Sequence, residues 1–262
     1  MQQIFKYPRT HHIEGSLAGP GDETLKWASF EVLKDRFVVI EEKLDGANSG
    51  ISFSPEGKLQ LQSRGHYLTG GPREKHFALF KTWANRYAAN LWAILGDRYV
   101  LYGEWLYAKH TVFYTDLPHY FMEFDLLDTQ SGTFLDTVSR KERLADAPFI
   151  RSVPILYEGT LPHLETLLQY VGPSHYIAED AQSRLTHLAE AQELRVEQVL
   201  RETDDSRLME GLYIKVEQDG EVLERYKYVR SGFMQTVFES GGHWLDRPII
   251  PNQLAEGVNL FA

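Results

Sequence analysis

Two hairpin turns, one in each half of the chain, constrain its fold more than any other feature. Ser54-Pro55-Glu56-Gly57 has the residues of a type I turn, and Asp219-Gly220 is a strong two-residue hairpin signal. Both turns join segments in which apolar and polar residues alternate. The sequence therefore predicts antiparallel strands over residues 37–65 and again over 211–230.

Other segments show their period just as clearly. Apolar residues recur at helical intervals over 77–95, which predicts a helix packed on a sheet, and 98–108 and 120–128 read as two further strands. From Leu161 the period is helical again and predicts a short helix near 164–171 and a longer one over 185–200. The residues from Ser231 onward predict no element, and no repeat or linker divides the chain.

The overall charge argues against a broad grip on nucleic acid. The 262 residues carry 27 Lys and Arg against 37 Asp and Glu, a formal charge of −10. However, residues 179–205 hold eight acids and three arginines, so half of this excess lies in the helical stretch. There is no cysteine, which excludes disulfides, thiolate metal sites and a cysteine nucleophile. Without an apolar membrane span or signal peptide, we expect a cytosolic (cytoplasmic) protein with no membrane contact.

The first chemical candidate is Lys43-Leu44-Asp45-Gly46, at the end of an apolar strand. An ammonium and a carboxylate two residues apart lie on the same side of an extended backbone, and a neutral lysine amine is a good nucleophile. If the numbers of paired residues in the first hairpin add up to about 111, Arg64 returns close to Lys43 and Asp45. The alternatives are a surface lysine entering a turn and a solvated edge-strand arginine.

Acids isolated among apolar strand residues are the second group of candidates, since each needs a partner or a metal. They are Glu104, Glu123, Asp125 and Glu210. In the last hairpin, a two-residue turn predicts that Leu212 lies opposite Lys227. One face then carries Glu210, Arg225 and Lys227, which suits a metal-bound polyphosphate, while Lys215 points the other way. The alternative is a cross-strand salt bridge.

In combination, the charged strand segments resemble a family. KLDG (43–46), SRG (63–65), YGEW (102–105), FMEFDLLD (121–128), EGLYIK (210–215) and RYKYVR (225–230) follow the order and spacing of covalent nucleotidyltransferases, the superfamily of ATP-dependent DNA and RNA ligases and mRNA capping enzymes. The chain looks most like the RNA ligase 2-like branch. That resemblance implies an α+β fold of the nucleotidyltransferase type (ATP-grasp-like), with antiparallel sheets flanked by helices, a helical insertion at about 160–205 and no OB-fold.

The resemblance also implies roles for individual residues. Lys43 would attack the α-phosphate of ATP, release pyrophosphate and hold AMP covalently, with Asp45 and Lys227 as further catalytic residues. Arg64 and Glu104 would contact the ribose, and Phe124 would stack on adenine, unless it is simply core. Glu210 would bind Mg²⁺ or Mn²⁺. Lys227 with Arg225 would hold the α-phosphate, Lys215 would line the nucleotide site, and Glu41, Glu42 or a backbone carbonyl would select ATP over GTP.

Some features depart from the family pattern. Arg225 stands where many members have lysine, and KLDG is closer to the DNA ligase form. Because 32 residues follow Arg230, too few for an OB-fold or the usual C-terminal RNA-binding domain, self-adenylylation is better supported than complete sealing. We expect one adenylyltransferase domain over residues 1–240 and a short tail over 241–262.

The expected substrate is RNA with 5′-phosphate and 3′-hydroxyl ends, in RNA repair, with an end-healing kinase or phosphatase as a candidate partner and a monomeric chain. Basic and aromatic residues that suit phosphate contact and base stacking, or are simply solvated, are Lys6, Arg9, His11, His12, Arg64, His66, Arg73, Lys75, His76, Lys81, Lys109 and His110, with Tyr67, Tyr107, Phe113 and Tyr114. The alternatives are a DNA ligase, a capping-type guanylyltransferase, and a non-catalytic nucleotide- or RNA-binding module.

Overall fold

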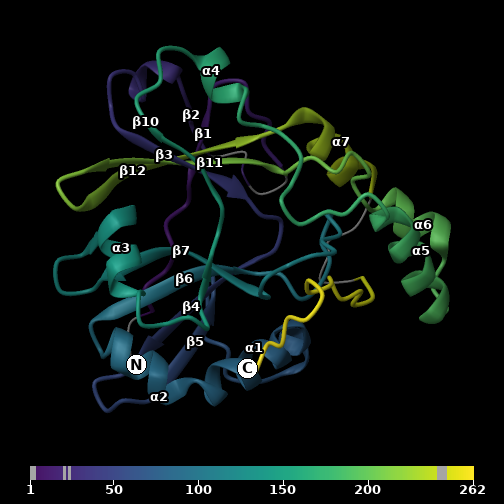
Figure 1. Ribbon diagram of the computed structural model, residues 1–262, viewed down its shortest axis with the longest axis horizontal. Coiled ribbons are helices and arrows are strands. Elements are labelled where there is room, and N and C mark those ends of the chain that lie inside the picture. Colours follow the sequence, from purple (N-terminus) through teal and green to yellow (C-terminus); the bar gives the residue numbers. More distant parts are fainter. Residues whose placement is uncertain (1–3, 20–21, 23–24, 241–246) are drawn as a thin grey trace.

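Two sheets lie one above the other in the computed structural model (Figure 1), which describes residues 4–19, 22, 25–240 and 247–262. In spatial order, sheet A contains β10 (Ile155–Gly159), β3 (Val38–Lys43), β11 (Gly211–Gln218), β12 (Glu221–Val229), β1 (His11–Ile13) and β2 (Trp27–Ala28). Sheet B contains β5 (Leu59–Ser63), β4 (Ala47–Phe53), β6 (Tyr99–Trp105), β7 (Phe121–Asp128) and β8 (Thr133–Phe134), with β9 (Arg151–Ser152) beside β7.

The predicted α+β class is confirmed. Most neighbouring strands are antiparallel, but β1 runs parallel to both β12 and β2, and β9 runs parallel to β7. Both sheets are open, so the described strands form no closed barrel. Among the same described residues, no helix has both the length and the apolar character needed to cross a membrane.

Helices pack against the sheets and also extend beyond them. They are η1 (Phe30–Val32), η2 (Pro72–Phe77), α1 (Ala78–Arg86), α2 (Ala88–Leu95), α3 (Thr137–Arg143), α4 (Leu164–Leu168), α5 (Ala181–Ala191), α6 (Val196–Arg201) and α7 (Ser231–Glu239). Helices α1 and α2 cover the outer face of sheet B. Phe80 and Trp83 from α1 are fully buried there beside Trp105 and Phe121, which fixes the sheet that carries half of the cleft.

Two predicted helices are each divided in two. The helix over 77–95 is interrupted at Tyr87, whose ring stacks on Phe149 with centroids 4.6 Å apart and whose hydroxyl donates to the Ala262 carbonyl. The helix predicted over 185–200 ends at residue 191, because Glu193 adopts a left-handed φ of 56° and the Leu194 N–H bonds back to the Ala189 carbonyl. Such a left-handed residue closes a helix.

Each hairpin departs by one residue from its predicted register. At the first turn Gly57 adopts φ 75° and adds a bulge, so Ser63 lies opposite Ser49 rather than Asn48. Next to its turn the second hairpin has the predicted pairing. A bulge between Val216 and Glu217 then shifts the pairing of the rest of β11 with β12 by one residue. Residues beyond the bulge therefore face the opposite way from the prediction.

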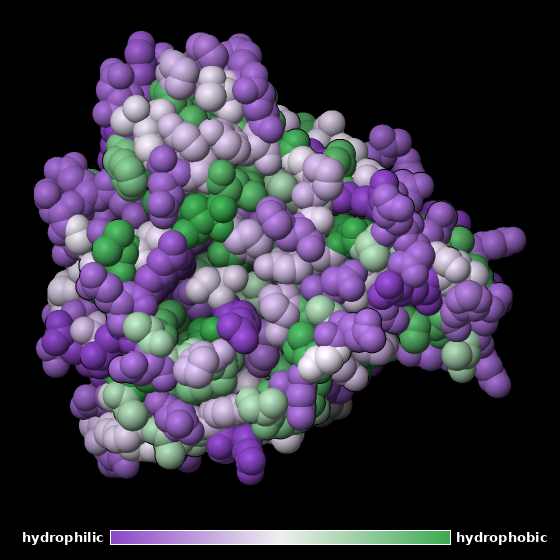
Figure 2. Space-filling view, in the orientation of Figure 1, coloured by the Kyte–Doolittle hydropathy of each residue, from purple (hydrophilic) through white to green (hydrophobic). Residues whose placement is uncertain are grey.

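The acidic helical stretch forms an arm. Helices α5 and α6 project from the body at the right of Figure 1, and this arm is mostly hydrophilic on the face seen in Figure 2. A small apolar cluster that includes Leu185 and Val199 packs at its base against Phe113 and Ile250. The described C-terminal residues 247–262 return to the body, where Asn252 is buried and accepts a hydrogen bond from the Tyr114 N–H. No prediction from sequence covered this contact or helix α7.

Candidate active site

Lys43 ends β3 in sheet A, where β11 brings Glu210 beside it. The Lys43 ammonium lies 2.7 Å from the Glu210 carboxylate. Lys43 pairs across the strands with Gly211, and a Cβ added at Gly211 would lie only 1.8 Å from the Tyr228 carbonyl oxygen. Glycine is therefore required at the position next to Glu210, because any side chain would push β11 and β12 apart.

The carboxylates around Lys43 are short of positive charge. Burial raises the pKa of Glu104 to about 8 and that of Glu210 to about 7, although Lys43 acts to lower both. Burial alone would lower the pKa of Lys43, but Glu210 and Glu104 outweigh it and raise that pKa. Arg64 also acts to lower the pKa of Glu104, and Lys227 that of Glu210, yet burial outweighs these cations, so a further cation or a ligand donor would stabilise the cluster.

Glu210 has room for such a cation. Its Oε2 atom is buried and accepts no hydrogen bond. Among the residues that the structure describes, no group of three or more acids or histidines forms a preassembled metal site. A divalent ion at Glu210 would therefore take its remaining ligands from water and from bound phosphates, as Mg²⁺ commonly does.

Asp45 is fixed by the loop that follows β6. Its carboxylate accepts hydrogen bonds from the Thr111 and Val112 amides at 2.7 and 2.8 Å, and its own N–H donates to the Tyr114 hydroxyl. Burial raises the pKa of Asp45. Asp45 therefore positions the turn after Lys43 against sheet B.

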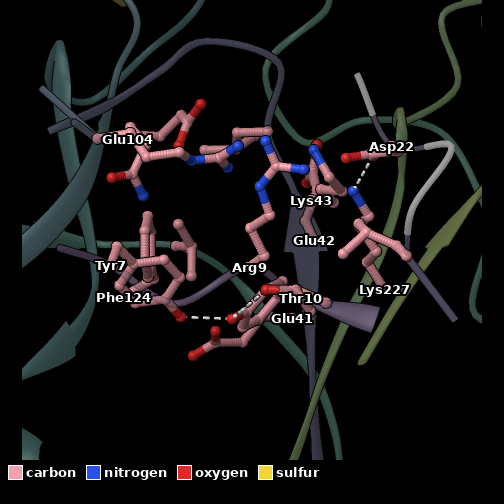
Figure 3. A pocket seen from close by; sticks show the side chains of 16 residues that line it. Tyr7, Arg9, Thr10, Asp22, Glu41, Glu42, Lys43, Glu104, Phe124 and Lys227 are labelled. Atoms are coloured by element: carbon pink, nitrogen blue, oxygen red, sulfur yellow. Dashed lines mark hydrogen bonds and ion pairs between the residues drawn. The ribbon is translucent and has the colours of Figure 1, made fainter. Parts of the chain in front are cut away.

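A cavity between the two sheets, which we call the nucleotide cavity, brings most of the candidate residues together. Its lining includes Glu42, Lys43, Arg64, Glu104, Phe124 and Lys227. Figure 3 shows Phe124 and Tyr7 at one end and Lys227 with Asp22 at the other, with Lys43 between. An aromatic ring at one end and cations around Lys43 suit a base joined to a phosphate.

Lys227 is held by Asp22, a residue that no sequence motif indicated. The two side chains form an ion pair, and Asp22 also lies 3.3 Å from the ring of the buried His12. Burial, with the nearby charge of Lys43, lowers the pKa of Lys227, and Asp22 only partly offsets that effect. Lys227 is therefore an ammonium that an incoming anion would stabilise.

Lys215 and Arg225 lie elsewhere, in what we call the buried ion network. Because of the bulge in β11, Lys215 pairs directly with Arg225, so the prediction that it points the other way is wrong. Lys215 lies 2.9 Å from Glu41 and 3.2 Å from Asp125, and Arg225 lies 2.9 Å from Asp125. Neither is among the described residues that line the nucleotide cavity.

Arg140 of α3 is the third cation of the buried ion network. It lies 2.8 Å from Glu41 and 3.6 Å from Glu123, and all three side chains are essentially inaccessible to solvent. Lys215 also donates to the Phe124 carbonyl. The network, consisting of Glu41, Glu123, Asp125, Arg140, Lys215 and Arg225, thus joins both sheets beneath the cavity and holds the strand that carries Phe124.

The acids before Lys43 already have protein partners. Glu41 belongs to the buried ion network, and the Glu42 carboxylate accepts from the Ser174 hydroxyl at 2.5 Å and lies 2.7 Å from His175 Nδ1. Both side chains also line the nucleotide cavity, so the three candidates for selecting the base all stay predictions.

Residues of the N-terminal segment that precedes β1, which we call the N-terminal arm together with residues up to Gly19, complete the cavity. Tyr7, Arg9 and Thr10 line it, and the Tyr7 ring packs edge-on against Phe124 with centroids 5.2 Å apart. Arg9 rises through the middle of the cavity in Figure 3. The sequence marked Arg9 only as a basic residue that might face RNA, and Tyr7 and Asp22 carried no signal.

Several residues expected to face RNA are internal instead. Lys109 is buried and donates to the carbonyls of His110 and Glu202. His12, His76 and His110 are buried, as are Phe113 and Tyr114, so the prediction of a basic and aromatic surface is wrong for these residues. The side chain of Arg73 lies outside the described residues.

Comparisons with known proteins agree with the geometry. A family model described as RNA ligase matches residues 36–229, more than half of the chain. A comparison of this chain with curated protein sequences found no match.

Solved structures of Naegleria gruberi RNA ligase variants share the fold. One variant with ATP and Mn has a TM-score of 0.53 at 18% identity, and the match covers 88% of this chain and 58% of the Naegleria chain. Another with ATP and Mn has a TM-score of 0.51 at 16% identity, and the match covers 80% of this chain and 54% of the Naegleria chain. A third, with AMP and Mn, has a TM-score of 0.52 at 17% identity and covers 88% and 57%. This chain spans less than two thirds of the length of those proteins.

Proposed function

The chain belongs to the RNA ligase family, and from that premise we propose that it is an ATP-dependent RNA ligase whose nucleophile is Lys43. One observation carries the proposal. The Lys43 ammonium lies 2.7 Å from Glu210, at the edge of a cavity that Arg64, Glu104, Phe124 and Lys227 also line.

In the first step, the Lys43 ammonium gives up a proton to solvent and its nitrogen bonds to the α-phosphorus of ATP. The bond between the α-phosphorus and the oxygen that links it to the β-phosphate breaks. Pyrophosphate leaves with the bonding electrons, and AMP stays on Lys43. Lys227 holds the α-phosphate, since its lowered pKa marks an ammonium that gains from a nearby anion. Phe124 stacks on adenine, and Arg64 and Glu104 contact the ribose.

Glu210 is the proposed metal ligand. Its orphaned Oε2 atom and its pKa of about 7 fit a divalent cation. When bound, Mg²⁺ or Mn²⁺ supplies charge neutralisation for the phosphates. Lys215 and Arg225 act as positioning residues, because their charges are already neutralised by Glu41 and Asp125.

The later steps join RNA ends. AMP passes from Lys43 to an RNA 5′-phosphate, and a 3′-hydroxyl then attacks that activated end to form a phosphodiester and release AMP. Such a reaction needs ends that carry these groups, so an enzyme that adds 5′-phosphates or removes 3′-phosphates is the expected partner in RNA repair.

Covalent labelling tests the first step. We expect the protein with Mn²⁺ and α-labelled ATP to gain a covalent AMP, Lys43→Ala to gain none, and Lys58→Ala, which changes an exposed lysine of the first hairpin turn, to label normally. Label that survives Lys43→Ala would refute the nucleophile. Label from GTP alone would indicate a capping-type enzyme, and no label with either nucleotide would indicate a binding module.

A sealing assay then identifies the polynucleotide. The labelled protein is offered 5′-phosphorylated single-stranded RNA, nicked duplex RNA and nicked DNA in parallel. We expect joined RNA, and sealing confined to nicked DNA would make the protein a DNA ligase.

A further inference from the structure

A second hollow opens on the other side of Lys43 from the nucleotide cavity. The two share Asp22, Lys43 and Lys227 as a common wall. We call the second one the α7 groove, and its remaining walls include Leu17, His110, Phe233, Met234, Phe238 and Arg247. Anything bound there would reach a group carried on Lys43 from the side away from Phe124.

One wall of the α7 groove is apolar and ends in an exposed aromatic ring. Phe233 and Met234 are buried, and the N-terminal arm approaches so closely that a Cβ at Gly19 would lie 3.0 Å from the Met234 methyl. Phe238, one turn further along α7, is 59% exposed. Helix α7 thus presents an exposed ring in a groove that Lys43 also lines, and nucleobases stack on such rings.

The facing wall carries positive charge. Arg247 donates to two neutral acceptors, the His110 carbonyl at 3.2 Å and the Ser240 hydroxyl at 2.7 Å, and it lies 3.7 Å from Glu202. Lys227 lies in the shared wall. These cations suit a phosphate that enters between them.

The acids that line the α7 groove are each engaged by protein donors. Asp45 accepts from two backbone amides, Asp22 pairs with Lys227, and Glu210 pairs with Lys43. They therefore repel an incoming anion less than free carboxylates would, and a cation at Glu210 would weaken that repulsion further.

We propose that the α7 groove binds the 5′-terminal nucleotide of the RNA, with its base against Phe238 and its phosphate at the wall formed by Lys43 and Lys227. This inference rests on the proposed function and names where the second substrate binds. An oxygen of the 5′-phosphate then bonds to the adenylate phosphorus, the phosphorus–nitrogen bond breaks, and the Lys43 nitrogen takes up a proton. The products are AMP-capped RNA and free Lys43.

The test separates the two substrates by changing Phe238, which lines the α7 groove and is not among the described residues that line the nucleotide cavity. Protein already labelled with AMP is mixed with increasing 5′-phosphorylated RNA, and the rate of AMP transfer is followed. Since base stacking contributes about 1–3 kcal/mol, Phe238→Ala should raise the half-saturating RNA concentration roughly 5- to 150-fold. Phe238→Trp should restore it, and Phe37→Ala, which removes a similarly exposed ring at the far end of β3, should not change it.

Direct binding gives a readout that needs no catalysis. Fluorescence anisotropy of a 5′-phosphorylated RNA oligonucleotide is measured without ATP, with wild-type protein and with Phe238→Ala. We expect weaker binding with Phe238→Ala, and weaker binding of a 5′-hydroxyl oligonucleotide to the wild type.

Two results would overturn the α7 groove proposal. One is equal RNA binding with and without the Phe238 ring, and the other is equal binding of 5′-phosphate and 5′-hydroxyl ends. Failure of wild-type self-labelling would instead contradict the proposed function, while the binding experiment would still decide whether the groove takes an RNA end.

Discussion

The buried ion network and the Lys43 site draw on the same strands, β3, β11 and β12, but they treat charge differently. In the network three acids meet three cations, and Arg225 and Lys215 hold the pKa of Asp125 at about 2 although burial would raise it. Around Lys43, burial raises the pKa of Glu104 to about 8 and that of Glu210 to about 7. The network is balanced in charge and fixes the sheets in place, whereas at Glu104 and Glu210 burial outweighs the cations Lys43, Arg64 and Lys227, which indicates where a ligand's charge enters.

Removing a cation from the balanced cluster should have the largest effect. Arg140→Ala leaves Glu123 buried without its cation and Glu41 with Lys215 alone, so we expect the free energy of unfolding to fall by about 3–5 kcal/mol in urea titrations. Lys141→Ala, which changes an exposed neighbour on the same helix, should alter it by no more than about 0.5 kcal/mol. An Arg140→Ala protein as stable as wild type would show that the network is not what joins the sheets.

The same change of charge at Lys227 should affect rate rather than stability. If Lys227 binds the α-phosphate as it is transferred, Lys227→Met should slow single-turnover adenylylation about 100- to 1,000-fold, with little change in the urea midpoint. Lys215→Met is the matched comparison, since it should lower the urea midpoint. If Lys227→Met lowers the urea midpoint but leaves the adenylylation rate unchanged, Lys227 has a structural role like that of the buried ion network.

The smallest expected effect is a pH dependence of stability without nucleotide. Glu104 keeps its proton more tightly when folded, so its contribution to stability is complete below its ordinary pKa of 4.5 and is lost as pH rises to about 8. Differential scanning fluorimetry at pH 5 and pH 9 should therefore show a smaller drop in Tm for Glu104→Gln than for wild type. Glu165→Gln, at an exposed position, should match wild type, and an equal drop in Glu104→Gln would place the titration elsewhere.

Local patterns in the sequence predicted the strands well but not their fine register. The two turns and the apolar strand before Lys43 located β3, β4, β5, β11 and β12, because turn chemistry and alternation are local properties. The bulge after Val216 was not predictable, since an extra residue in one strand depends on its partner strand. That single bulge reversed the predicted direction of Lys215.

The site was predictable where motifs mark it and not where distant segments complete it. Lys43, Arg64, Glu104 and Phe124 do line one cavity, as their motifs indicated. Asp22 has no motif, and its role follows only from the contact with Lys227 across sheet A. The sequence grouped Arg225 with Lys227 by spacing, whereas burial beside Asp125 separates them.

Strand β1 has a consequence for how the protein is made. It pairs in parallel with β12, His11 opposite Tyr226 and His12 opposite Lys227, so β1 leaves the ribosome long before the strand it pairs with. Contacts between such distant parts of a chain form slowly during folding. The pair of Asp22 with Lys227 and the walls that Tyr7 and Arg9 provide thus assemble late, and a partly synthesised chain cannot enclose a nucleotide before translation has passed β12.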